Sequence, residues 1–151
     1  MGENLLGTNV VCQVAIVIND IEAKAKAWAQ LLGVEPPAWR MTDTADKSHI
    51  RYLGATTEAR AKLAFFQLGP QVRLELIEPV GRPSTWGQFL DAHGEGIHHI
   101  AFIVKGMDEV ALRLEGVGLK AVQRGDYTGG RYAYVDGEAQ LAAILELLEN
   151  F

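Results

Sequence analysis

Residues 97–104 read IHHIAFIV, and residues 11–18 read VCQVAIVI. Each stretch is a nearly continuous apolar run with several β-branched residues, which is typical of a buried strand. When the two stretches are superposed, Gln13 pairs with His99, and an alanine follows two residues later in each, at Ala15 and Ala101. This match indicates that the chain is built from an internal repeat.

A helix is predicted after each of these strands. In the first copy Asn19 and Glu22 have the spacing of a capping box, and apolar residues follow at helical spacing: Ile21, Ala25, Trp28 and Leu32. The second copy has a matching stripe, formed by Met107, Val110, Leu114 and Val117. Glycine is common just past a helix end, so Gly33 is predicted to end the first helix and Gly116 or Gly118 the second.

The two copies also end alike, with LELIE at residues 74–78 and LELLE at residues 145–149. A Gly-rich stretch at residues 125–130 of the second copy is typical of a hairpin loop. Further strands are expected between each helix and its closing strand, at about residues 48–53, 62–68, 119–124 and 131–135. Each copy is therefore predicted to form one βαβββ module.

These patterns predict an α+β fold with two βαβββ modules, at about residues 9–80 and 97–150. The connector at residues 79–96 is expected to contain a short helix at about residues 84–93. A module of about 70 residues would be only marginally stable alone. We therefore expect the modules to share one core, in a single domain that covers residues 1–151.

The composition excludes several classes of function. Apolar residues make up 48% of the chain and charged residues 22%, with a formal net charge of −5 and no cluster of Lys and Arg, so no nucleic-acid partner is expected. No apolar run is long enough to span a membrane, and the first nine residues lack a signal-peptide pattern. Cys12 is the only cysteine and cannot form an internal disulfide, which favours a cytoplasmic protein.

Four polar residues occupy equivalent positions in the two copies. Side chains alternate between the faces of a strand, so Gln13 and His99 are expected on the inner face of the sheet, next to small alanines that leave room for a ligand. Glu75 and Glu146 alternate with leucines on the closing strands. A buried carboxylate is rarely left unpaired. A divalent metal ion bound by these four residues would explain the pattern.

Other polar residues have simpler interpretations. His98 is expected to be a hydrogen-bonded core residue on the face opposite His99. Glu78 and Glu149 are expected to be solvated strand ends. Gln13 itself could bond only to the backbone.

The repeat resembles the vicinal oxygen chelate superfamily, which includes glyoxalases, bleomycin resistance proteins and dioxygenases, over nearly the whole chain. Within it, WGQFL at residues 86–90 followed by GEGIHHIAF at residues 94–102 is similar to methylmalonyl-CoA epimerases and their close relatives. The resemblance implies a curved mixed sheet around a metal-binding cavity. It also implies a divalent ion, such as Zn²⁺, Co²⁺, Ni²⁺, Mn²⁺ or Mg²⁺, with ligands at Gln13, Glu75, His99 and Glu146.

One departure separates the chain from the epimerases. They usually present a histidine on the first strand, where this chain has Gln13. The set of Gln, Glu, His and Glu instead resembles glyoxalase I, although the surroundings of Glu146 are not those of that family. The substrate is therefore expected to be a small molecule of either kind, an acyl-CoA or a glutathione thioester or hemithioacetal.

The resemblance implies a metal-dependent isomerase or epimerase, in which a carboxylate removes an α-proton and the metal stabilises the resulting enolate. Epimerases carry a glutamate before the third strand, and Glu58 falls in the matching region, so Glu58 and Glu146 are the predicted acid/base pair. The alternative for Glu58 is a solvated loop residue. In a glyoxalase I-like lyase, Glu75 and Glu146 would suffice. A metal-free small-molecule-binding protein is the alternative of another class. Relatives often form homodimers, so one is expected here.

Overall fold

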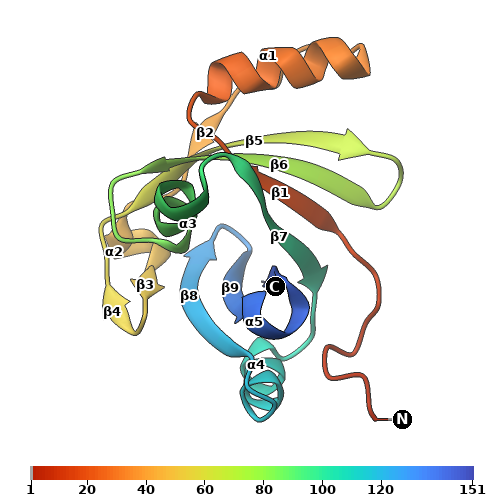
Figure 1. Ribbon diagram of the computed structural model, residues 1–151, viewed down its shortest axis with the longest axis vertical. Coiled ribbons are helices and arrows are strands. Elements are labelled where there is room, and N and C mark those ends of the chain that lie inside the picture. The colour runs from red at the N-terminus through yellow and green to blue at the C-terminus, as the bar shows by residue number, and fades with distance from the viewer. Residues whose placement is uncertain (1) are drawn as a thin grey trace.

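The computed structural model describes residues 2–151 and forms one curled, mixed sheet (Figure 1). The order of the strands across the sheet is β2-β5-β6-β1-β7-β10-β9-β8-β3-β4. The strands are β1 (Gln13–Val17), β2 (Arg40–Met41), β3 (Arg51–Tyr52), β4 (Ala55–Thr56), β5 (Arg60–Leu68), β6 (Val72–Val80), β7 (Gly96–Ile103), β8 (Lys120–Tyr127), β9 (Gly130–Gly137) and β10 (Ala143–Asn150). The helices are α1 (Ile21–Leu32), α2 (Ala45–Ser48), α3 (Thr85–His93), α4 (Met107–Glu115) and α5 (Glu138–Leu141).

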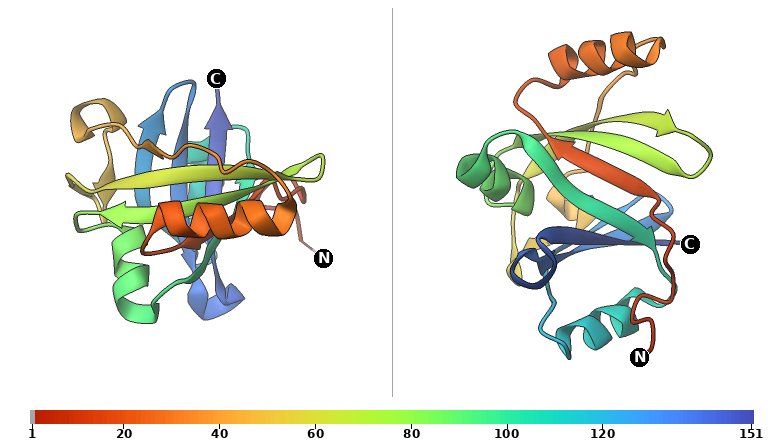
Figure 2. Two further views of the ribbon diagram at one scale, coloured as in Figure 1. Left: turned by 90° about the horizontal axis from the view of Figure 1, so that it is seen from above. Right: turned by 45° about the vertical axis from the view of Figure 1, so that its right-hand side comes forward.

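The predicted repeat determines the centre of the sheet. β1 and β7, the two repeat-equivalent strands, pair antiparallel with each other. β1 pairs in parallel with the closing strand β6, and β7 pairs in parallel with the closing strand β10. The curled sheet forms a half-barrel, which confirms the predicted α+β fold of two βαβββ modules. Figure 2 shows α1 and α4 on the outer side of this half-barrel, one over each module.

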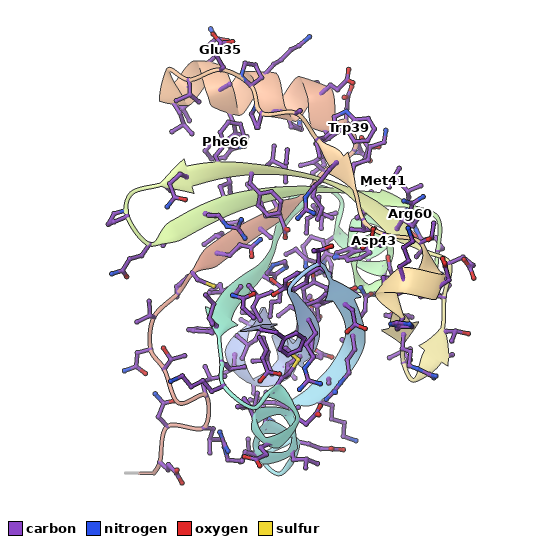
Figure 3. The ribbon with its side chains drawn as sticks, turned by 180° about the vertical axis from the view of Figure 1, so that it is seen from behind. Glu35, Trp39, Met41, Asp43, Arg60 and Phe66 are labelled. Atoms are coloured by element: carbon purple, nitrogen blue, oxygen red, sulfur yellow. The ribbon has the colours of Figure 1, made fainter. Side chains whose placement is uncertain are left out.

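Helix α1 covers the outer face of the first module. Its buried residues Ile21, Ala25 and Ala29 pack in one cluster with Phe66 of β5, which projects toward the helix in Figure 3. Gly33 ends the helix in the left-handed conformation, with φ 67°, as predicted. The predicted cap was wrong by one residue, because the side chain of Asp20, not Asn19, accepts the hydrogen bond from the Ala23 amide.

The glutamates predicted to be solvated strand ends have a structural role in both modules. Glu78 accepts a hydrogen bond from the Ile21 amide at the start of α1. Glu149 accepts hydrogen bonds from the Gly106 and Met107 amides at the start of α4. A carboxylate is favourable at a helix N-terminus, where backbone amides lack partners inside the helix. Each closing strand therefore fixes the helix of its own module.

The segment of residues 42–59, here called the strap, joins the two ends of the half-barrel. β2 pairs with β5 at one edge of the sheet, whereas β3 pairs with β8 near the opposite edge. The Nδ1 atom of His49 lies 2.8 Å from the Asp126 Oδ2 atom on β8. At the start of the strap, the carbonyl oxygen of Thr42, next to Asp43, accepts a hydrogen bond from Arg60 of β5 (Figure 3).

The strap differs from the strand predicted at about residues 48–53. Residues 45–48 form the short helix α2, and only Arg51 and Tyr52 are extended. His49 and Leu53 have positive φ angles of 49° and 52°, which interrupt an extended chain. Two neighbours of Ser48, Ala45 and Ile50, pack into the inner hydrophobic cluster of the half-barrel.

The connector contains α3, as predicted for residues 84–93. Ser84 caps this helix by accepting a hydrogen bond from the Gly87 amide. Trp86 is buried against the inner face of the sheet, in the same cluster as Tyr134 of β9. None of the helices formed by residues 2–151 is long and apolar enough to cross a lipid bilayer.

Candidate functional site

The inner side of the half-barrel holds a cavity of about 610 Å³. Gln13, Glu75 and Glu146 line it from β1, β6 and β10, which are three of the four central strands. His99 is 1% exposed and lies beside the two carboxylates. All four residues predicted as metal ligands are therefore buried on the inner side of the sheet.

Three of these residues meet at one point. The Nε2 atom of His99 lies 2.9 Å from Glu146 Oε2 and 3.6 Å from Glu75 Oε1. Ligand atoms of Glu75, His99 and Glu146 all lie within 4.8 Å of one another. Ligand atoms that share one ion at about 2.0–2.2 Å lie about 3–4 Å apart, so this spacing is compatible with a shared divalent ion.

The hydrogen bonding of the site also fits a cation. Glu75 Oε1, His99 Nε2 and Glu146 Oε2 are buried and have no hydrogen-bond partner among the described residues. His99 Nε2 and Glu146 Oε2 are close, but they lack the alignment of a hydrogen bond. Leaving buried polar groups unsatisfied costs about 1–3 kcal/mol each, and more when they are charged. A divalent cation would satisfy all three atoms and neutralise the two carboxylates.

Burial and proximity shift the proton affinities of the site. Burial, together with the charge of Glu146, raises the pKa of Glu75 to about 7, and a hydrogen bond from Gln13 opposes this rise. Burial alone would lower the pKa of His99, but the neighbouring carboxylates Glu146 and Glu75 outweigh it and raise that pKa. Protons therefore compete with a metal for these ligands near neutral pH.

His98 lies on the same side as His99, not on the opposite face as predicted. The register between β1 and β7 shifts between Ala15 and Ile16, where Ala15 pairs with His99 and Ile16 with Ile97, so His98 is an extra residue in a β-bulge. Its Nδ1 atom lies 2.9 Å from His99 Nδ1, and its Nε2 atom lies 3.1 Å from Thr85 Oγ1. It is a hydrogen-bonded core residue, as predicted.

This contact couples the tautomer of His99 to that of His98. Burial lowers the pKa of His98 to about 3, so its ring is neutral. If His98 carries its proton on Nε2 and donates it to Thr85, its Nδ1 atom accepts the Nδ1–H of His99. His99 Nε2 is then free to present its lone pair between the two glutamates, as a metal ligand requires.

Replacing His98 by leucine should therefore weaken divalent metal binding about 10- to 100-fold, the usual effect of losing a hydrogen-bond partner of a ligand. His98→Asn should retain most of the affinity, because its amide oxygen can accept the same hydrogen bond. Calorimetric titration with Co²⁺ measures both effects. Equal affinities for the wild type and the leucine variant would refute this role of His98.

The structure does not bring Glu58 to the site. Thr57, Ala59 and Ala61 are buried, whereas Glu58 between them is exposed and is absent from the cavity lining. Side chains alternate between the two sides of an extended chain, so Glu58 points outward when its neighbours point inward. The resemblance located Glu58 only to within a residue, so it could not determine on which side the side chain lies. The predicted catalytic role of Glu58 stays a prediction.

The cavity also contains polar residues that the sequence analysis did not identify. Tyr132 and Tyr134 line it from β9, and Ser48 lines it from the strap. The spacing of the tyrosines by two residues was a usable signal, since it places both on one face of a strand. No pattern in the sequence indicates Ser48, which reaches the cavity only because the strap crosses the half-barrel.

Comparisons with known proteins identify the family of the chain. The family model described as Glyoxalase/Bleomycin resistance protein/Dioxygenase superfamily matches residues 12–135. The uncharacterized protein YqjC of Bacillus subtilis (strain 168) is 33% identical over 95 residues, which cover 61% of this chain and 67% of that protein. A 2-epi-5-epi-valiolone epimerase from Actinomyces sp. is 28% identical over 140 residues, which cover 88% of this chain and 76% of the relative.

Similar solved structures include several methylmalonyl-CoA epimerases. The enzyme from Mycobacterium tuberculosis superposes with a TM-score of 0.65 at 19% identity, over 100% of this chain and 93% of that one. A Streptomyces coelicolor variant in complex with 2-nitronate-propionyl-CoA superposes with a TM-score of 0.64 at 19% identity, over 93% of this chain and 96% of that one. At this identity the likeness concerns the fold. The family match over most of the sequence, together with this fold, means that the chain belongs to the glyoxalase/bleomycin resistance protein/dioxygenase superfamily.

Proposed function

We propose that this protein is a metal-dependent isomerase that removes and returns a proton on a carbon next to a carbonyl group, as an epimerase does. The observation that carries the proposal is the set of unpartnered buried atoms of Glu75, His99 and Glu146, which converge within one ion's reach on the cavity. These three residues would hold the ion, with the Gln13 side chain as the fourth ligand.

A divalent ion in this place would polarise a substrate oxygen and stabilise negative charge that develops on it. The side chains around it would handle the proton. Glu146 is our candidate for the base that removes the proton. Glu75 is our candidate for the group that returns it, because β6 carries it on the other flank of β1 and β7 from Glu146 on β10.

The part of the cavity around Phe65 suits an anionic substrate. Arg40 and Arg73 line it, and their guanidinium groups lie 5.6 and 4.5 Å from the centre of the Phe65 ring, which also lines the cavity. Guanidinium groups bind phosphate and carboxylate well. An acyl-CoA substrate, as in the solved complex of a methylmalonyl-CoA epimerase with methylmalonyl-CoA, would satisfy this requirement.

Hydrogen exchange tests the reaction directly. Incubating Co²⁺-loaded protein in D₂O with methylmalonyl-CoA or with 2-epi-5-epi-valiolone should introduce deuterium at the carbon next to the carbonyl of at least one of them. Mass spectrometry measures the label. If neither compound gains deuterium, but a glutathione hemithioacetal is converted to a thioester, the glyoxalase I-like lyase is the correct function. Two observations support that second candidate. Glu58 is exposed, and Glu75 and Glu146, the two carboxylates that a glyoxalase I-like lyase would need, lie close together in the site.

Metal content separates both enzymes from the remaining alternative. A ligand-binding protein without a metal would have to keep Glu75 and Glu146 close together in a buried cavity, where His99, Gln13 and Arg73 offset their charge only in part, since the pKa of Glu75 is still raised. Purified protein that takes up no Co²⁺, Ni²⁺, Zn²⁺ or Mn²⁺ would favour this alternative over an isomerase.

A further inference from the structure

The cavity wall beside Glu146, whose cross-strand partner is Tyr134, is rich in hydroxyl groups whose protons have no acceptor within the protein. It is formed by Ser48, Tyr132 and Tyr134, here called the hydroxyl wall, all of which line the cavity. Tyr132 and Tyr134 pack in one inner cluster with Ala45 and Ile50, the neighbours of Ser48 on the strap.

The direction of the hydrogen bond to Tyr134 is determined by chemistry alone. The indole nitrogen of Trp86 lies 2.9 Å from the Tyr134 oxygen. An indole N–H can only donate, so the phenol oxygen of Tyr134 must accept. The hydrogen bonds of the described residues leave the phenol proton of Tyr134 without an acceptor.

The same reasoning applies to Tyr132 through one more residue. The Thr85 amide donates to Gln123 Oε1 at 2.8 Å, which determines the orientation of the Gln123 side chain. Its NH₂ group, Nε2, lies 3.1 Å from the Tyr132 oxygen and can only donate. Tyr132 therefore accepts as well, and its own proton is also free.

Ser48 is the member of the wall whose hydroxyl group makes no hydrogen bond with the described residues. It is only 6% exposed, and its Oγ atom has no hydrogen-bond partner among residues 2–151. Burial raises the pKa of both tyrosines, so all three hydroxyl groups keep their protons at neutral pH. Three residues that line the cavity therefore carry hydroxyl protons without an acceptor among the described residues.

We infer that the hydroxyl wall binds an acceptor oxygen of the substrate, separate from the oxygen that approaches the metal ligands. The inference rests on the proposed function, because the ligand of the hydroxyl wall is a substrate only if the protein is an enzyme. It predicts a ligand with two oxygen functions close together, the second being a carboxylate or a neutral hydroxyl or carbonyl group. Ser48 is then a specificity-determining residue supplied by the strap.

Three small probes of similar shape test this subsite by equilibrium binding. Isobutyrate, lactate and methylmalonate share a carboxylate and a methyl group on one carbon, and differ only in whether that carbon also carries a methyl, a hydroxyl or a second carboxylate. Lactate or methylmalonate should bind at least about 10-fold more tightly than isobutyrate, a usual effect of hydrogen bonds to a buried group. Whichever is tighter identifies the oxygen as neutral or anionic.

The preference should disappear when the wall loses a hydroxyl. Ser48→Ala and Tyr132→Phe should bring the affinities of the three probes to within about threefold of one another. Tyr127→Phe is the matched control. Tyr127 also lines the cavity, but its hydroxyl already donates to Asn150 Oδ1 at 2.7 Å, so this variant should keep the wild-type preference.

Stability distinguishes a binding role of Ser48 from a structural one. Because its hydroxyl makes no hydrogen bond within the protein, Ser48→Ala should melt at or above the wild-type temperature. A structural hydroxyl would instead lower Tm by about 2–4 °C or more when removed. A lower Tm, equal binding of all three probes, or no binding at millimolar concentration would each overturn the inference.

The titrations should be run on Co²⁺-loaded and on metal-free protein. A probe preference that depends on Ser48 and Tyr132 in both states, without deuterium exchange in any substrate, would retain the subsite and reject the proposed reaction. Exchange that is unaffected by Ser48→Ala and Tyr132→Phe would retain the reaction and reject the subsite.

Discussion

Glu146→Gln should reduce the rate of deuterium exchange about 10²–10⁴-fold or more at saturating Co²⁺, the usual effect of losing a positioned acid/base group. The substitution keeps the size of the side chain and removes its negative charge. It also replaces a carboxylate that lies 2.9 Å from His99 Nε2, so Co²⁺ binding should weaken in the same variant. Exchange kinetics over a range of Co²⁺ concentrations separate the loss of metal from the loss of the base.

Glu58→Gln is the control for this experiment. Glu58 is exposed and outside the cavity lining, so the variant should exchange deuterium at the wild-type rate. If Glu58→Gln instead loses activity while still binding Co²⁺, the two-base arrangement expected from the resemblance is correct. Full activity of Glu146→Gln at saturating metal would reject Glu146 as the base.

Metal loading should raise the free energy of unfolding by about 4 kcal/mol when free metal is about 1,000 times its Kd. At one fixed concentration of free metal the gain should be larger at pH 8 than at pH 6.5, because fewer protons then compete for Glu75 and His99 and the metal-free protein is less stable. The folded-state pKa of Glu75, about 7, lies above its ordinary value of 4.5, so its contribution is present below pH 4.5 and is lost as the pH rises to about 7. The raised pKa of His99 acts in the same direction above pH 6.5.

His98 limits the range in which this trend is visible. Its folded-state pKa of about 3 lies below the ordinary value of 6.5, so its contribution is lost as the pH falls below 6.5. Between pH 4.5 and 6.5 the two effects oppose each other, which is why the comparison is made above pH 6.5. Urea unfolding of metal-free and Co²⁺-loaded protein at the two pH values measures the difference.

Glu75→Gln is the matched variant for the stability experiment. It removes the charge that must be buried, so the metal-free variant should be more stable than the wild type at pH 8 and should gain less from Co²⁺. Metal-free protein that is equally stable at both pH values, and unchanged by Co²⁺, would contradict the metal site.

The sequence predicted the repeat and the position of the buried polar residues because both depend on strand periodicity. Equivalent strands must bury equivalent faces, so Gln13, His99, Glu75 and Glu146 follow from the alignment of two short motifs. The fold class follows from the same pattern, since each module repeats one order of elements.

Features that depend on tertiary contacts or local irregularities were predicted poorly. The orientation of His98 depends on a bulge, which shifts the alternation by one residue. The helix-capping roles of Glu78 and Glu149 depend on where the helices lie over the closing strands. The strand predicted at about residues 48–53 is limited to Arg51 and Tyr52, because residues 45–48 form a helical turn and His49 has a positive φ angle.

The strap makes the two halves of the cavity unequal, and this has a stereochemical consequence for the proposed reaction. β1 and β7 lie side by side, with Glu75 on one flank and Glu146 on the other, so an approximate twofold axis relates the two carboxylates. The strap, inserted between β2 and β5, has only the tight turn between β8 and β9 as its counterpart in the second module. A planar enolate between the carboxylates would show them its two faces almost symmetrically. The strap and its Ser48 would then make the two faces unequal, in addition to the difference between Gln13 and its repeat partner His99, so part of the handedness of the site is encoded in the inserted segment.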